Sequence, residues 1–188
     1  KGFYFQPCFS VVWDTAIAAY ALAEVAESPA GVEVGPALTR CADWLLTKEC
    51  RRRGDWAVKR PNLEPSGWYF EFANEFYPDI DDTAMVLIGL EKARATNITA
   101  QQATHRRAVN WLLGMQGKDG GWAAFDVDNN WNFLSDVPFA DHNAMLDPEC
   151  PDITGRVIDG LTRHGISPSH PAIRKGVQYL FDSQEADG

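Results

Sequence analysis

The sequence has few of the features that mark membrane-spanning, secreted or nucleic-acid-binding proteins. None of its apolar runs approaches the roughly 18 residues of a transmembrane helix, and residues 1–10 lack the charged-then-apolar layout of a signal peptide. Lysine and arginine number 17 against 26 aspartates and glutamates, which gives a formal net charge of −9. Because this net negative charge repels phosphate backbones, nucleic acid is not an expected partner.

Cysteine and histidine are also scarce, and their spacing does not suit a ligand or redox site. The four cysteines never form Cys-x-x-Cys, and the four histidines have no metal-ligand spacing. We expect reduced, mostly buried thiols. No P-loop or Gly-x-Ser-x-Gly motif occurs, and Asp81-Asp82 lacks the third aspartate of an Asp-Asp-x-x-Asp magnesium site. The sequence therefore predicts no metal and no cofactor.

What the 188 residues do contain is a repeat of 67 to 68 residues that carries several of the seven tryptophans. Residues 107–122 hold a frame of a basic residue, an aromatic, leucine, glutamine, glycine and tryptophan, and residues 175–188 repeat it as far as the glycine. A weaker copy at 40–56 lacks the glutamine and puts Trp56 in the place of Trp122. Three copies in register indicate a repeat architecture.

A second element alternates with this frame. Short motifs containing threonine open three apolar runs, and aspartate or threonine before such a run is a helix N-cap signal. The motifs lie at 14–16, 82–84 and 153–155, and the runs extend through Ala26, Ala95 and His164. Because residues 84–90 are apolar on nearly every face, we expect these runs to be buried inner helices. The amphipathic tryptophan-leucine segments then form outer helices.

Alternating inner and outer helices predict an all-α protein, an α/α barrel (toroid) of helical hairpins. Strands have little support. Three hairpins amount to about half of an (α/α)6 barrel, and the first residue is not methionine. We therefore expect residues 1–188 to be part of a single barrel domain, truncated at both ends and inactive as an isolated piece.

The loop before the second inner helix carries three carboxylates, Asp79, Asp81 and Asp82. One aspartate at a helix start is explained by N-capping and the helix dipole. Three anions within four residues repel one another, so a second interpretation is that they share protons and keep one carboxyl protonated near neutral pH. The spacing leaves both interpretations open.

The repeat register brings a cation toward these acids. Aligning the threonines of successive units places Asp152 opposite Asp81 and Arg156 in the first turn of the next inner helix. Adjacent helices lie about 8 to 10 Å apart, within reach of an arginine side chain, although an arginine on a solvated rim would fit as well. In the preceding unit Trp13 takes the place of Asp81, and an aromatic there suits a cationic intermediate.

Taken together, these motifs resemble one enzyme family over essentially the whole chain. Residues 79–84 (Asp-Ile-Asp-Asp-Thr-Ala) resemble the Asp-x-Asp-Asp-Thr-Ala motif of class II terpene cyclases, and residues 107–122 look like their QW repeat. Residues 6–16 and 54–63 are similar to bacterial squalene-hopene cyclases. In eukaryotic-type oxidosqualene cyclases the acid motif reads Asp-Cys-Thr-Ala-Glu, so the carboxylate cluster favours squalene itself as substrate.

The resemblance implies a role for each candidate residue. Asp81 would protonate the terminal alkene of squalene, and the rest of the expected catalytic set is Asp79, Asp82, Asp152 and Arg156. The expected substrate-binding aromatics are Trp13, Phe70 and Phe125. Arg156 stands where some relatives have histidine, and Phe125 where some have tyrosine. An arginine can hold the carboxyl but cannot relay a proton.

The resemblance also implies hopene or hopanol-type products without a cofactor. The full-length protein would bind the bacterial inner membrane from its cytoplasmic side as a monotopic protein, with a homodimer as one expected assembly. Other readings are another bacterial polyprenyl cyclase, an α/α-toroid glycosidase, or a non-catalytic lipid-binding toroid. A glycosidase needs two carboxyls well separated across its cavity, whereas these acids cluster within one turn.

Squalene conversion by the full-length protein is predicted to be independent of divalent metal, because the sequence has neither an Asp-Asp-x-x-Asp site nor a histidine-cysteine cluster. Turnover should be equal with and without excess chelator, as measured by gas chromatography of the products. Activity lost on chelation and restored by magnesium would contradict this.

Overall fold

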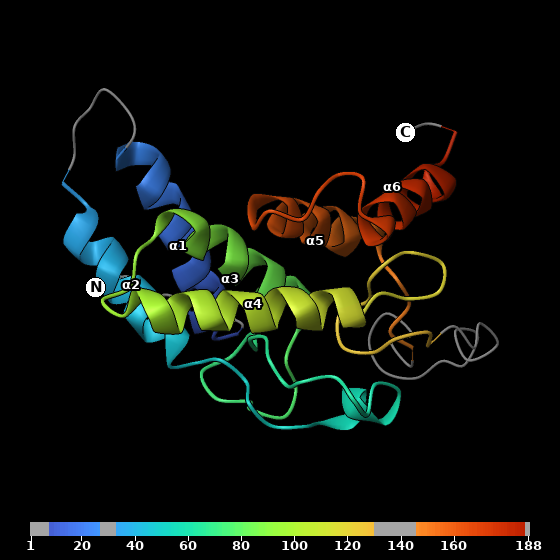
Figure 1. The fold of residues 1–188 in the computed structure, drawn as a ribbon, viewed down its shortest axis with the longest axis horizontal. Helices are drawn as coiled ribbons and strands as arrows, with labels where there is room; N and C mark the ends of the chain where they lie inside the picture. The colour runs from blue at the N-terminus through green and yellow to red at the C-terminus, as the bar shows by residue number, and fades with distance from the viewer. Residues whose placement is uncertain (1–7, 27–32, 130–145, 187–188) are drawn as a thin grey trace, which may run out of the picture.

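The computed structural model describes residues 8–26, 33–129 and 146–186, which form the helices drawn in Figure 1. In chain order the elements are α1 (Val11–Ala26), α2 (Gly35–Leu46), the short 3-10 helix η1 (Asp55–Val58), α3 (Ile80–Lys92), α4 (Ile98–Gly114), α5 (Pro151–Arg163) and α6 (Pro171–Ser183). Within these residues β-pairing is limited to one isolated bridge, between Trp68 and Asp79. The all-α class predicted from the sequence is confirmed.

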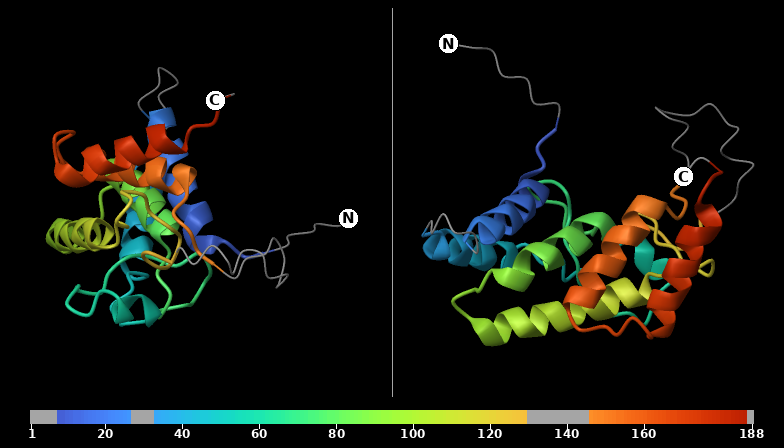
Figure 2. Two further views of the ribbon diagram at one scale, coloured as in Figure 1. Left: turned by 90° about the vertical axis from the view of Figure 1, so that its right-hand side faces the viewer. Right: turned by 90° about the horizontal axis from the view of Figure 1, so that it is seen from above.

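The helices form three hairpins whose first members lie side by side. Helix α3 packs against both α1 and α5, and each of these three helices also packs against the next helix along the chain, α2, α4 or α6. Figure 2 shows α3 between α1 and α5, with α2, α4 and α6 toward the periphery. The predicted alternation of inner and outer helices is therefore present.

Small residues let the inner helices approach closely. A Cβ atom on Gly89 of α3 would lie 2.7 Å from the backbone oxygen of Ala16 in α1. A Cβ atom on Gly160 of α5 would lie 3.3 Å from the oxygen of Ala84 in α3. Each glycine is six residues beyond the threonine of its own helix, and each alanine directly follows the threonine of the neighbouring helix. The same contact thus joins both pairs of inner helices.

Burial of the inner helices is less uniform than predicted. Helix α3 is buried along ten of its residues, because it has an inner neighbour on each side. Helix α1 buries a single stripe of small residues and leaves Ile17 and Val25 about 40% exposed. Helix α5 likewise buries one stripe. The expectation of inner helices buried all round is therefore wrong for α1 and α5.

The inner helices begin earlier than the threonine motifs predicted, and α3 and α5 also end earlier, whereas α1 ends at Ala26 as predicted. The N-cap of α3 is Asp79 and that of α5 is Cys150, so the threonines lie inside the first turn. Helix α3 ends at Lys92 and α5 at Arg163. After α3, the side-chain amide of Gln101 binds two carbonyls at the chain's exit from the helix and stabilises the turn there.

The structural counterpart of Trp122 is Trp68, and the predicted alignment with Trp56 is wrong. The backbone N–H of Trp68 donates to Thr83 Oγ1, and that of Trp122 donates to Thr154 Oγ1, both at 2.9 Å. Each indole N–H donates at 2.7 Å to a leucine carbonyl in the preceding outer helix. These bonds fix each inner helix against the turn that precedes it.

The alignment failed because the first unit has a longer connection. The bonded leucine and tryptophan are 23 residues apart in the first unit and 10 in the second. The added length runs beneath α4 and contains η1 (Figure 1). Trp56, in η1, packs edge-on against Trp111 at 5.8 Å between ring centroids.

The glutamine that the first unit lacks is replaced by Glu49, a residue the sequence reasoning passed over. Gln116 donates to the carbonyls of Gly120 and Ala172, which ties the end of α4 to α6. Glu49 instead accepts two hydrogen bonds from Arg107 and so ties the end of α2 to α4. The same position joins successive outer helices, with donor and acceptor reversed.

Replacing Gly89 with alanine should destabilise the protein, because the new Cβ would press on the backbone of α1. We expect a loss of about 1 to 3 kcal/mol, measured by denaturant unfolding of the full-length protein. Gly155→Ala is the matched control, since a Cβ there meets no atom within 4 Å, and it should be neutral or slightly stabilising. Equal effects of the two substitutions would refute the close-approach contact.

Candidate active site

The first two turns of three inner helices bring one predicted residue each to a common point. Arg156 of α5 donates from Nη1 to Oδ1 of Asp81 on α3 and forms an ion pair with it. The guanidinium carbon of Arg156 also lies 5.2 Å from the ring centroid of Trp13 on α1. The structure thus places the arginine between a carboxylate and an aromatic face, and the solvated-rim alternative is wrong.

Asp79 is the aspartate that caps α3. Its Oδ1 accepts from the backbone N–H of Asp81 at 2.7 Å and of Asp82 at 3.3 Å, and the residue is only 9% exposed. Burial raises the pKa of Asp79 to about 6, against the lowering effect of those two hydrogen bonds. Asp79 therefore serves both as a helix cap and as a carboxyl that titrates near neutrality.

Asp82 is the most deeply buried of the three acids. It is 1% exposed, and its Oδ1 has no hydrogen-bond partner. Burial, followed by the charges of Asp79 and Asp81, raises the pKa of Asp82 to about 8. At neutral pH this carboxyl holds a proton, which agrees with the interpretation of the acids as a proton-sharing cluster rather than as three caps.

Asp81 is the acid that faces the cation. Burial raises the pKa of its carboxyl, and the hydrogen bond and charge of Arg156 oppose that rise. Because Arg156 contacts Oδ1, the second oxygen is left to carry a transferable proton. Burial thus favours the protonated form of this carboxyl, and Arg156 stabilises the anion that would remain after the proton leaves.

Asp152 lies apart from this contact. It is exposed in the first turn of α5, where its Oδ1 accepts from Cys150 Sγ at 2.5 Å. That hydrogen bond lowers the pKa of Asp152, and its negative charge in turn slightly raises the pKa of Asp81. Asp152 thus influences the acid at a distance, and its predicted catalytic role rests on the sequence.

The two remaining predicted aromatics stand on segments bonded to the start of α3. Half-buried Phe70 follows Trp68, whose carbonyl accepts from the N–H of Asp79 at 2.7 Å. Phe125 follows Ala124, whose carbonyl accepts from the N–H of Ile80 at 2.8 Å. Both aromatics are therefore positioned from the same helix end that presents the acids.

A cavity of about 460 Å³ adjoins the guanidinium of Arg156. Its lining combines the apolar side chains of Tyr20, Met85, Ile88 and Leu180 with the charged Asp152 and Asp159. The arginine that pairs with the acid therefore borders a region with an apolar part that suits a hydrocarbon chain. Within the described residues no group of histidine, cysteine and acidic side chains is arranged to hold a metal ion.

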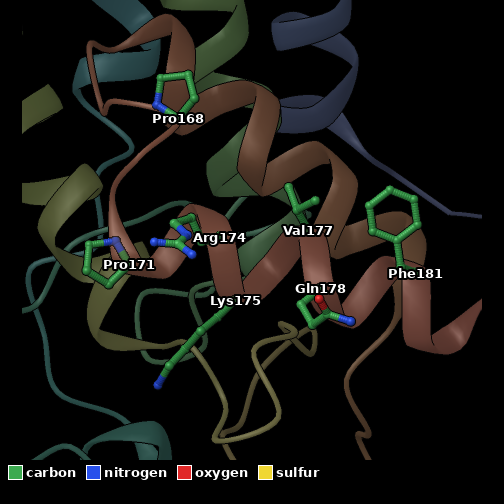
Figure 3. A pocket seen from close by; sticks show the side chains of 7 residues that line it. All are labelled: Pro168, Pro171, Arg174, Lys175, Val177, Gln178 and Phe181. Carbon is green, nitrogen blue, oxygen red and sulfur yellow. The ribbon is translucent and has the colours of Figure 1, made fainter.

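A second hollow, of about 560 Å³, lies on the outer side of α6 and has a different character. Arg174, Lys175, Val177, Gln178 and Phe181 line it along one helix face (Figure 3). This lining contains no carboxyl that could donate a proton. We therefore place the candidate active site at the inner helix starts.

Asp147 is a residue near the site that sequence reasoning missed. Its carboxylate accepts from the backbone N–H groups of Ala124, Phe125 and Asp126. Because these partners are backbone groups, no pattern of side chains in the sequence predicts the contact. An aspartate outside the repeat frame was the only available signal.

Comparisons with known proteins agree with this geometry. A family model described as the squalene-hopene cyclase C-terminal domain matches residues 9–188. The chain belongs to the squalene-hopene cyclase family. A squalene-hopene cyclase of Schizosaccharomyces japonicus is 41% identical over 98% of this chain, and one of Bradyrhizobium diazoefficiens is 42% identical over 98%. One of Alicyclobacillus acidocaldarius is 38% identical over all of it.

The chain spans 28 to 29% of the length of these squalene-hopene cyclases. Membership of the family agrees with the acid cluster at one helix start. The alternative hypothesis of an α/α-toroid glycosidase has no support. No described helix of this chain is both long and apolar enough to cross a membrane.

Burial of Asp82 should make stability fall as pH rises. Its pKa is about 8 in the folded state against an ordinary value of 3.8. Below about pH 4 the folded and unfolded states are both protonated, so burial of the charge costs nothing there. Between pH 4 and 8 the unfolded state ionises first, and the folded state loses stability progressively. Asp82→Asn removes this dependence on pH. The melting temperature of the variant minus that of the parent should therefore be larger at pH 8 than at pH 5.

The control for this measurement is Asp182→Asn, which makes the same chemical change on the exposed face of α6. Its melting temperature should follow that of the parent at both pH values. A difference between Asp82→Asn and the parent that does not change with pH would contradict the raised pKa.

Proposed function

We propose that the full-length protein is an isomerase that protonates squalene and guides its polycyclisation to hopene or hopanol-type pentacyclic triterpenes. The observation that carries this proposal is the position of Asp81, in a buried set of three carboxyls, against Arg156 and Trp13. Membership of the squalene-hopene cyclase family supports the same reaction. The geometry supplies an acid, a counter-charge and an aromatic face at one point.

The first step transfers a proton from the Asp81 carboxyl to the less substituted carbon of the terminal alkene. The alkene π electrons form the new C–H bond, and the adjacent carbon becomes cationic. Arg156 stabilises the carboxylate left behind by a charge-assisted hydrogen bond. Protonated Asp82 adds no second negative charge beside it, so the acid is stronger than its buried surroundings would otherwise allow.

Successive alkenes then attack the cation, and each ring closure moves the positive charge along the chain. Loss of a proton from the last cation gives a hopene-type product, and addition of water followed by proton loss gives a hopanol-type product. The proton taken from Asp81 is thus returned to the surroundings at the end. Aromatic faces such as those of Trp13, Phe70 and Phe125 stabilise the travelling charge, each by about 0.5 to 2 kcal/mol.

The substrate also suggests where the full-length protein works. Squalene is a hydrocarbon and dissolves in the bilayer core rather than in water. We therefore place the full-length protein on the cytoplasmic side of the bacterial inner membrane as a monotopic protein, with a homodimer as one assembly to test. Co-sedimentation with liposomes checks the first placement, and light scattering in detergent checks the second.

Substitution of the acid and its partner tests the reaction. Asp81→Asn cannot donate a carboxyl proton and should lower squalene turnover by about 10²-fold or more. Arg156→Leu removes the cation, raises the pKa of the carboxyl set and should lower kcat with little change in KM. Arg156→His should retain more activity, because a protonated imidazole can form the same hydrogen bond. Products are measured by gas chromatography.

The controls separate the proposed activity from its rivals. A non-catalytic lipid binder would make no product in the parent, and a cyclase for another polyprenyl substrate would convert that substrate in preference to squalene. If Arg156→Leu turned over squalene like the parent while Asp81→Asn did not, the acid would stand and the pairing would be wrong.

A further inference from the structure

Three consecutive backbone N–H groups converge on one carboxylate beside the site. Ala124 donates to Asp147 Oδ1 at 3.0 Å, Phe125 donates to Oδ2 at 2.6 Å, and Asp126 donates to Oδ2 at 2.8 Å. Hydrogen bonds to an ionised acceptor are stronger than those between neutral groups. Residues 124–126, here called the strap, are thereby held along their full length by a side chain 21 to 23 residues away in the sequence.

The other face of the strap is bonded to the helix that carries the acid. The carbonyl of Ala124 accepts from the N–H of Ile80 at 2.8 Å. Ile80 is the first residue of α3 and lies between Asp79 and Asp81 in the chain. A displacement of the strap would therefore change the position of Phe125 relative to the proton donor.

Side-chain packing does not explain the position of Phe125. Its side chain is 45% exposed and lines a small cavity of about 180 Å³ with Tyr77 and Pro78 among others. An aromatic with that much exposure has few contacts to fix its ring. Its backbone anchoring therefore sets the point from which the ring projects.

The far end of the strap has a separate anchor. Lys59 Nζ donates to the carbonyl of Val127 at 2.6 Å and pairs with Asp126 at 3.3 Å. Lys59 comes from the long connection that follows α2. This contact lies after Phe125, and the bond from Ile80 to the carbonyl of Ala124 lies before it, so the strap would stay attached to the protein if Asp147 lost its hydrogen bonds. The N–H of Phe125 itself would then lose its acceptor, and the backbone that carries the aromatic would be less firmly held.

We propose that Asp147 is a positioning residue for the cyclisation: it fixes the strap so that Phe125 stands at a set place relative to Asp81. This inference rests on the proposed function, because the aromatic matters only if a cation passes it. Asp147 touches no reacting atom. Its loss should leave protonation of the substrate intact and release partially cyclised cations, which then lose a proton early.

The test is Asp147→Asn in the full-length protein. An asparagine at this position has one acceptor oxygen and an amide that itself donates, so it cannot accept from all three strap N–H groups. We expect partially cyclised products to rise severalfold as a share of all products from squalene, with total turnover reduced less than tenfold. Asp147→Glu keeps both acceptor oxygens and should restore part of the parent product ratio.

The control is Asp128→Asn. Asp128 lies in the same loop and accepts from the N–H of Lys118 rather than from the strap. Its backbone has a φ of 53°, a conformation that asparagine also tolerates. This substitution should leave the product ratio of the parent unchanged.

Hydrogen exchange gives a readout that does not depend on turnover. Protection of the amides of residues 124–126 should fall at least tenfold in Asp147→Asn, while the amides of α3 and α4 keep theirs. Unchanged protection of the strap would overturn the anchoring, and an unchanged product ratio with lost protection would overturn the positioning role. If the parent made no product from squalene, the proposed function would fail while exchange still decided the anchoring.

Discussion

The close approach of the three inner helices is the constraint on which the site depends. Gly89 against Ala16, and Gly160 against Ala84, allow backbones to meet without side chains between them. Helices at that separation bring their first turns within reach of one another. An extra methyl group at either crossing would separate the helix starts, and the contacts of Arg156 with both neighbouring helices would lengthen together.

Close packing also buries several carboxyls together, which makes their ionisation unfavourable. Three carboxyls at the buried start of α3 lose hydration, and burial is the largest cause of the raised pKa in each. The three acids differ in what compensates them. Asp79 receives two backbone N–H groups, Asp81 receives a guanidinium, and Asp82 receives no partner at Oδ1. These different partners give the three acids different roles within one turn: Asp79 caps the helix, Asp81 is the proposed proton donor, and Asp82 holds a proton beside it.

The sequence was sufficient where the repeat keeps its length and insufficient where it does not. The threonine lies four or five residues into each inner helix, so counting from it placed Arg156 beside Asp81 and Trp13. The alignment of Trp56 with Trp122 failed because the first unit carries a longer connection, and only the bonds of Trp68 reveal the equivalent residue. Asp147 and Glu49 escaped prediction for a related reason. Their roles are defined by partners that folding brings together from distant segments.

The identity of the cation has a consequence for how the acid responds to pH. A histidine facing Asp81 would lose its charge near neutral pH, so the strength of the acid would depend on the titration of its partner. An arginine side chain, by contrast, keeps its charge at any such pH, and the ring of Trp13 lies against Arg156 without offering a proton acceptor. The groups of the site that gain or lose protons near neutral pH are therefore its carboxyls. With Asp82 titrating at about 8 and Asp79 at about 6, the number of protons held beside Asp81 changes across the physiological range. The strength of Asp81 as an acid then depends on whether Asp79 and Asp82, which lie in the same helix turn, are ionised.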